Sequence, residues 1–172
     1  TIERLANGNF DTITASGNSA ADGSWSRSAF SGTSFNTLLA GQTNAQSGGS
    51  YAYLGVNATT SSQTVDSKAT LIPSTATAAT LSFYTSIVTS ETGTTAYDKL
   101  QVQLVDASTN AVITTLVTLS NANSTGSATS YVQRSYNVAA YAGRNVKVRL
   151  LATTDSSLAT TFRVDTVSLK TN

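Results

Sequence analysis

The chain of 172 residues contains no cysteine, no histidine and no methionine, and it has a single proline. Without cysteine or histidine it can form no disulfide, no thiol nucleophile, no Ser-His-Asp relay and no ordinary zinc, copper or haem site. Charged residues make up only 11% of the chain, and ten basic against nine acidic side chains give a net charge of +1. This balance offers no basic excess for nucleic acid. Several enzyme classes and nucleic-acid binding are therefore excluded.

Long hydrophobic runs are also absent. No stretch approaches the 18 or so consecutive apolar residues of a transmembrane helix. The opening segment Thr1–Arg4 does not have the pattern of a signal peptide, and the chain starts without methionine. We therefore expect a mature fragment or an excised domain of a larger protein. The length suits one domain that covers residues 1–172.

Threonine and serine are abundant, with 30 and 25 residues, and short apolar runs recur among them. Threonine is β-branched and suits strands. Strict alternation of apolar and polar residues over Thr80–Val88, Leu100–Val105 and Val146–Leu150 indicates half-buried strands. Other segments are predicted as strands from their composition: Phe10–Thr14, Ser50–Val56, Ser62–Ser67, Val112–Leu119, Tyr131–Val138 and Phe162–Lys170.

Helical periodicity is missing from every long segment, and only Ala139–Gly143 is predicted as a single helical turn. Asp106–Ala111 is predicted as a hairpin connection, and Ala15–Gly49 is rich in glycine and is predicted to be rich in loops. An α/β fold would need amphipathic helices between its strands. The sequence therefore predicts an all-β protein, a two-sheet antiparallel β-sandwich.

Three segments carry a resemblance to a known family. Leu5–Asp11 (LANGNFD) resembles the N-G-x-F-E/D opening of jelly-roll carbohydrate-binding modules, Ser47–Gly55 (SGGSYAYLG) resembles their S-G-x-Y-A-x-L-G strand, and Phe162–Leu169 (FRVDTVSL) resembles their closing strand. In this order the segments resemble the galactose-binding-like jelly-roll domains that are appended to secreted bacterial proteases and glycosidases. The resemblance implies a jelly-roll sandwich, and it does not identify a ligand, because this fold hosts many functions.

The resemblance also implies a structural calcium ion (Ca²⁺) where the first and last strands meet. Carried over to this chain, its ligands are Asp11, Asp165 and the loop Ser47–Ser50, with Asn7 and Asn9 as helpers. Oxygen ligands of this kind suit calcium. The chain departs from the family pattern by having Asp11 where glutamate is commoner and Thr166 where a second aspartate is usual. The alternative is that Asp11 caps a turn and that Asp165 pairs with an arginine.

A second group of acids is Glu91, Asp98 and Asp155, which lie near the ends of predicted strands. If the sandwich brings these ends together, three carboxylates would repel each other and a bound cation would relieve the repulsion. The alternative is three separate loop acids, each hydrogen-bonded to nearby serine and threonine residues.

Sugar binding needs flat aromatic faces and planar polar groups. Trp25 is one aromatic candidate for stacking on a sugar. Five residues are predicted to face outward and could share one sheet face: Tyr84, Gln101, Gln103, Lys147 and Arg149. The alternatives are an ordinary solvated sheet face and a tryptophan that fills the core.

These features predict a non-catalytic, calcium-stabilised extracellular binding module, secreted or at the cell surface. Its expected ligand is a carbohydrate or another cell-surface polymer. Only nine carboxylates are present, and they do not form the paired arrangement that a glycosidase requires. The alternative function is a structural, adhesive or spacer domain of a secreted or surface protein, including one that stabilises a secreted protease.

Overall fold

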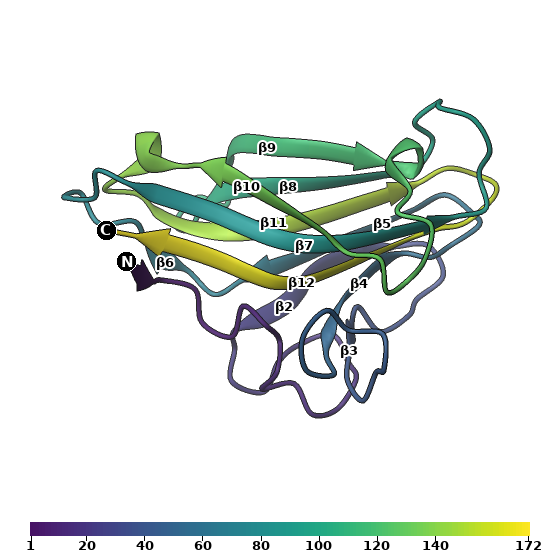
Figure 1. The fold of residues 1–172 in the computed structure, drawn as a ribbon, viewed down its shortest axis with the longest axis horizontal. Helices are drawn as coiled ribbons and strands as arrows, with labels where there is room; N and C mark the ends of the chain where they lie inside the picture. Colours follow the sequence, from purple (N-terminus) through teal and green to yellow (C-terminus); the bar gives the residue numbers. More distant parts are fainter.

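Two antiparallel β-sheets pack against each other in the structure, a computed structural model that describes residues 1–172 (Figure 1). Sheet A has the strand order β10 (Val132–Asn137), β7 (Ala79–Thr89), β12 (Thr160–Thr171), β4 (Tyr51–Gly55) and β3 (Leu38–Leu39), and β1 (Ile2–Glu3) also pairs with β12. Sheet B has the order β2 (Trp25–Ser31), β5 (Ser61–Ser67), β11 (Asn145–Thr154), β8 (Lys99–Asp106) and β9 (Val112–Ser120), and β6 (Thr70–Leu71) also pairs with β11. The predicted two-sheet sandwich is therefore confirmed.

The core lies between the sheets and follows the alternation of the sequence. In β7, Leu81 and Phe83 are completely buried, and in β11, Val148 and Leu150 are completely buried. Their neighbours in sequence point to the outer faces because successive strand side chains point to opposite sides. The polar side chains that alternate with the core residues in β5, β8 and β11 therefore lie on the outer face of sheet B.

The two ends of the chain lie side by side, as Figure 1 shows. Ile2 pairs with Thr171, and Glu3 pairs with Lys170. Further along, Gly8 packs so closely on the carbonyl oxygen of Val167 that no Cβ atom would fit between them. Glycine at this position therefore allows the N-terminal segment to follow the last strand.

The prediction of a strand over Phe10–Thr14 is wrong. These residues form turns, and Phe10 has a positive φ of 62°. Phe10 is completely buried and its ring centroid lies 4.7 Å from that of Trp25. The apolar residues of this segment enter the core from a loop, which an alternating pattern cannot distinguish from a strand.

The region Ala15–Gly49 is rich in loops, as predicted, but it also contains two strands that the sequence did not indicate, β2 and β3. Strand β2 has a register shift between Arg27 and Ala29, which breaks the regular alternation that sequence patterns detect. The predicted helical turn is confirmed as a short 3-10 helix, η2 (Ala139–Tyr141), and a second one, η1 (Asn121–Asn123), follows β9. The structure contains no helix of the length and apolarity needed to span a membrane.

Candidate functional site

The junction of the first and last strands brings Asp11, Asp165 and the Ser47–Ser50 loop together. The Asp165 side chain is completely buried, and its carboxylate accepts hydrogen bonds from the backbone N–H of Ser47 at 3.0 Å and of Thr166 at 2.7 Å. The carboxylate of Asp11 lies against Gly48 of the same loop, where a side chain on that residue would collide with it. Two acids that are 154 positions apart in the sequence therefore meet at one loop.

The other predicted ligands at this junction are engaged elsewhere. The side-chain oxygens of Asn7 and Asn9 accept hydrogen bonds from the backbone N–H groups of Thr12 and Asp11, and the Ser50 hydroxyl donates to the carbonyl oxygen of Ile13. Backbone N–H groups already stabilise the Asp165 carboxylate. The side-chain oxygens of Asn7, Asn9 and Ser50 are therefore used within the chain, and the two carboxylates of Asp11 and Asp165 are the charged oxygen ligands that the junction offers.

Burial, together with the nearby charge of Asp11, raises the pKa of the Asp165 carboxyl to about 6, even though backbone N–H groups favour its ionised form. An acid with a raised pKa in the folded state stabilises that state at low pH, and this contribution is lost as the pH rises through about 6. In calcium-free buffer we expect this contribution to decrease by about 2 kcal/mol between about pH 4 and about pH 7. Urea unfolding of the wild type and of Asp165→Asn at several pH values measures it.

Burial also raises the pKa values of Glu91 and Asp98, so these acids make the stability of both proteins depend on pH in the same direction. The difference between the pH profiles of the wild type and Asp165→Asn therefore reports Asp165 alone. Parallel pH profiles for the wild type and Asp165→Asn would contradict the assignment of a buried, proton-holding carboxyl to this position.

At the far end of the sandwich, Glu91, Asp98 and Asp155 do converge, as the sequence predicted. One carboxylate oxygen from each lies within 4.8 Å of the others. Asp98 is completely buried and accepts hydrogen bonds from the backbone N–H of Asp155 at 3.0 Å and from the hydroxyl of Thr160 at 2.6 Å. The Oε1 atom of Glu91 is buried and has no hydrogen-bond partner. This carboxylate cluster is able to hold a metal ion.

The pKa values of this cluster reflect its crowding. Burial raises the pKa of Glu91, and the charges of Asp155 and Asp98 raise it further. Burial also raises the pKa of Asp98, against the opposing effect of its hydrogen bond from Thr160. A hard cation with oxygen ligands would neutralise this concentration of negative charge.

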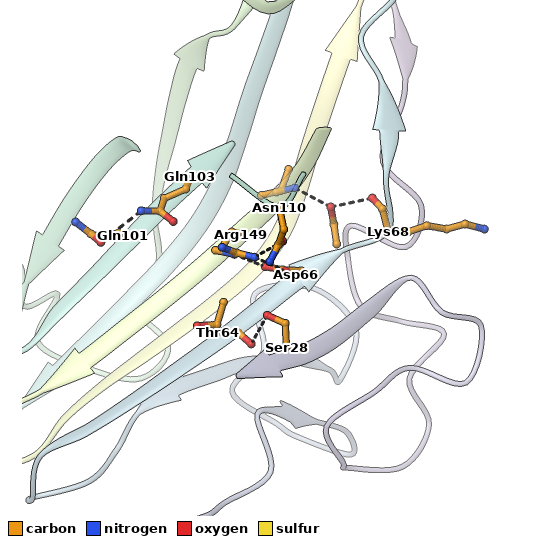
Figure 2. A network of polar contacts seen from close by, with 10 residues as sticks. Ser28, Thr64, Asp66, Lys68, Gln101, Gln103, Asn110 and Arg149 are labelled. Carbon is orange, nitrogen blue, oxygen red and sulfur yellow. Dashed lines mark hydrogen bonds and ion pairs between the residues drawn. The ribbon is translucent and has the colours of Figure 1, made fainter. Parts of the chain in front are cut away.

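The outer face of sheet B carries four of the five residues predicted for sugar binding: Gln101 and Gln103 on β8, and Lys147 and Arg149 on β11. Gln103 lies directly opposite Arg149, and Gln101 lies opposite Leu151. The amide of Gln103 donates to Gln101 at 3.5 Å and to Thr115 at 3.1 Å, while its own Oε1 is buried without a partner. Figure 2 shows Gln101 and Gln103 together with Arg149, which lies on the neighbouring strand.

Arg149 is held by two residues that the sequence did not single out. Its Nε and Nη2 atoms donate to the two carboxylate oxygens of Asp66 at 2.8 and 3.0 Å, and Nη2 also donates to the side chain of Asn110 at 2.7 Å (Figure 2). The hydrogen bond and charge of Asp66 raise the pKa of Arg149. Gln101, Gln103, Arg149 and Asp66 together form a line of planar polar groups across three strands, which we call the polar row.

Tyr84 does not belong to this face. It lies on β7 of sheet A, where it pairs with Gln133 of β10 and with Asp165 of β12. The expectation of one face shared by all five residues is therefore wrong for Tyr84. Alternation along a strand indicates which side chains share a side of that strand, but it does not indicate to which sheet the strand belongs.

Trp25 is a core residue and not an exposed sugar platform. Its side chain is completely buried, it packs on Phe10, and its indole N–H donates to the carbonyl oxygen of Asn7 at 2.9 Å. A ring with no exposed surface cannot stack on a sugar, so Trp25 is not a ligand contact in this structure.

Solved structures with this fold differ strongly from the chain in sequence. No known protein family and no curated protein matches the sequence. The carbohydrate-binding module TmCBM61, solved in complex with β-1,4-galactotriose, has a TM-score of 0.64 and 14% identity, with both chains covered completely. The carbohydrate-binding module CBM28, described as specific for non-crystalline cellulose, has a TM-score of 0.53 and 13% identity, over 92% of this chain and 98% of that one.

A cyclase from Fischerella sp. TAU is also similar, with a TM-score of 0.51 and 12% identity over 99% of this chain and 97% of that one. At such identities the similarity establishes the fold. The chain is a jelly-roll β-sandwich of the type found in carbohydrate-binding modules.

Proposed function

We propose that this chain is a non-catalytic module that binds a carbohydrate on the outer face of sheet B. The observation that carries the proposal is the polar row. Arg149 is fixed by Asp66 and Asn110, and Gln101 and Gln103 lie beside it on the neighbouring strand. Rigid, planar donors and acceptors suit the hydroxyl groups of a sugar, because little side-chain entropy is lost when they bind.

Gln101 is the partly exposed glutamine of the polar row, whereas the Oε1 of Gln103 is a buried acceptor without a partner. A sugar hydroxyl would reach this oxygen only if the Gln103 amide turned outward on binding. The contact would then remove an unsatisfied polar group that costs about 1–3 kcal/mol. The structural similarity to two carbohydrate-binding modules supports the same class of ligand.

The polar row does not contain the groups needed for glycoside hydrolysis. Such reactions use two carboxyl groups about 5–10 Å apart across the bond that breaks. Asp66 is the one carboxylate in the row, and both of its oxygens accept hydrogen bonds from Arg149. Binding without catalysis is therefore the function that this face supports. We further propose that the module acts outside the cell, secreted or at the cell surface as part of a larger protein, where polysaccharides are accessible.

Replacing both Gln101 and Gln103 by alanine is expected to weaken oligosaccharide binding at least tenfold. Each amide contributes a net hydrogen-bond energy of about 1 kcal/mol, and about 1.4 kcal/mol corresponds to a factor of ten in Kd. Isothermal titration calorimetry with β-1,4-galactotriose and with cello-oligosaccharides measures the change. Gln133→Ala is the matched control, because Gln133 is exposed on the outer side of sheet A. Equal weakening by the control would contradict a site on sheet B.

A structural or adhesive module is the second candidate function. Its support is that the outward-facing positions of β5, β8 and β11 carry no aromatic ring, and stacking on such rings is a common source of sugar affinity. A module that only spaces or adheres would bind none of the oligosaccharides, so the same calorimetry separates the two functions.

We also propose that Glu91, Asp98 and Asp155 bind calcium and stabilise the fold. The cluster joins the two ends of the loop between β7 and β8, which carry Glu91 and Asp98, to the loop after β11, where Asp155 lies 57 positions from Asp98. Three carboxylates supply the hard oxygen ligands that calcium prefers. Their charge is not balanced by any ion pair, because the two ion pairs of the structure involve Asp106 and Asp66.

Calcium at about 100 times its Kd is expected to raise the melting temperature by about 5–10 °C, because binding to the folded state alone contributes about 2.7 kcal/mol. Differential scanning calorimetry with calcium and with EDTA measures the shift. Glu91→Gln should abolish it, whereas Glu3→Gln, an exposed acid at the opposite end, should not. If Asp165→Asn abolished the shift and Glu91→Gln did not, the ion would lie at the junction of the strands. Identical melting with calcium and EDTA would contradict any calcium site.

A further inference from the structure

A cavity of about 310 Å³ opens at the edge of the sandwich formed by β7 and β10, away from the polar row. Its walls come from β7, from the segment after η1 and from β10. Its lining includes Thr85, Ile87, Ser124, Thr125, Val132 and Arg134. Ligand pockets begin at about 300 Å³, so the cavity has room for a small ligand of one or two rings.

Arg134 is the only charged residue of this cavity, and it has no counter-ion in the chain. The two ion pairs of the structure use Arg144 and Arg149. The Nε atom of Arg134 is buried and has no hydrogen-bond partner. A guanidinium group offers a planar fork that matches a carboxylate, and an unpaired one next to a cavity favours an anionic ligand.

The remaining polar groups suit the hydroxyls of a sugar. Ser124 and Thr125 donate their hydroxyl protons to the carbonyl oxygen of Ile87 at 3.2 and 3.3 Å, and Thr85 donates to the carbonyl oxygen of Arg163 at 2.8 Å. The hydroxyl oxygens of Ser124 and Thr125 also accept hydrogen bonds from the N–H groups of Gly126 at 3.3 Å and Ile87 at 3.0 Å. Each oxygen keeps one further lone pair and can act toward a ligand as an acceptor, and sugar hydroxyls are good donors.

The other two cavities lack this combination. One, of about 360 Å³, contains charges of both signs, Glu3 and Lys170, and Glu3 already accepts hydrogen bonds from the backbone N–H of Leu169 and from the side chain of Ser168. The other, of about 270 Å³, is lined by the segment Thr12–Ala21 and contains no charged residue. Only the cavity at β7 and β10 combines one unpaired cation with several hydroxyl acceptors and an apolar wall.

We propose that this cavity binds an acidic sugar, a hexuronic acid unit, with its carboxylate on Arg134 and its hydroxyl groups on the serine and threonine oxygens. The apolar side of the ring would lie against Ile87 and Val132. The choice of a sugar as the class of ligand rests on the proposed function, whereas the acidic character rests on Arg134 alone. The cavity is a second site, separate from the polar row of sheet B.

Nuclear magnetic resonance titration of the ¹⁵N-labelled chain tests the proposal with D-galacturonic acid, D-galactose and inorganic sulfate as probes. Galacturonate is expected to shift the amide signals of residues 123–134 and to bind at least tenfold more tightly than galactose, which differs only by having CH₂OH in place of the carboxylate. Arg134→Gln and Arg134→Lys should each weaken galacturonate binding at least tenfold, the first by removing the charge and the second by removing the fork. Arg144→Gln is the matched control, since its side chain is 46% exposed and lies outside the cavity.

Three results would overturn the acidic-sugar site: equal affinity for galactose and galacturonate, unchanged galacturonate binding in both Arg134 variants, or sulfate binding as tight as that of galacturonate, which would show recognition of charge alone. Arg134→Lys keeps the positive charge and the long side chain, so it remains informative if Arg134→Gln fails to fold. Oligosaccharide shifts on β8 and β11 are recorded in the same samples. If oligosaccharides shift the signals of β8 and β11 but galacturonate does not bind at the cavity, the acidic-sugar site is rejected and the polar row stands. If galacturonate binds at the cavity but no oligosaccharide shifts β8 or β11, the polar row is rejected as a sugar site and the acidic-sugar site stands.

Discussion

Replacing Trp25 by alanine is expected to lower the free energy of unfolding by about 3–5 kcal/mol, the usual loss for a buried aromatic side chain. The side chain is completely buried, its ring packs on that of Phe10, and its N–H group satisfies the carbonyl oxygen of Asn7. The substitution would leave a cavity and an unpaired acceptor together. Urea unfolding monitored by circular dichroism measures the loss.

Tyr97→Ala serves as the control for Trp25, because this aromatic residue is 47% exposed and its removal should change stability by well under 1 kcal/mol. Oligosaccharide affinity of Trp25→Ala should equal that of the wild type at temperatures where the variant remains folded. A variant that keeps its stability but loses sugar binding would show that Trp25 contacts the ligand, and it would contradict the assignment of Trp25 to the core.

Replacing Arg149 by methionine is expected to cost about 3–5 kcal/mol, because it leaves the carboxylate of Asp66 buried without its partner. The two side chains retain only 12% and 4% of their exposed area, and they share two hydrogen bonds. The double variant Asp66→Leu/Arg149→Met removes both charges and should be less destabilised than the sum of the single variants, by about 2 kcal/mol or more.

Chemical unfolding of the four proteins in this cycle gives the interaction energy of the pair. The Arg144–Asp106 pair is a suitable comparison, since the side chain of Arg144 is 46% exposed and exposed pairs contribute about 0–1 kcal/mol. An Arg149→Met variant that loses less than 1 kcal/mol would contradict a rigid polar row.

The sequence predicted most of the fold because its strands are half-buried. The alternation in β7, β8 and β11 identifies their inner residues, and these residues are buried in the structure. Alternation failed for Phe10–Thr14, where the buried residues come from a loop, and for β2, where a register shift interrupts the pattern. Regular periodicity therefore predicts regular strands well, and it is uninformative where turns supply the core.

The candidate sites were predicted only in part, for a physical reason. The convergence of Glu91, Asp98 and Asp155 follows from strand ends that meet in an antiparallel sandwich, so the sequence could predict it. The pairing of Arg149 with Asp66 joins residues 83 positions apart and depends on the order of strands in sheet B, which no local pattern specifies. The same holds for Tyr84, whose strand lies in sheet A, and for the cavity next to Arg134.

The central claim is that the polar row of sheet B binds a carbohydrate. Its most direct test is a map of amide chemical shifts during titration of the labelled chain with neutral oligosaccharides. We expect the largest shifts at Asp66, Gln101, Gln103 and Arg149, with little change at Tyr84 and Gln133 on the opposite face. Largest shifts on sheet A, or no shift on sheet B with any oligosaccharide of the panel, would contradict the claim.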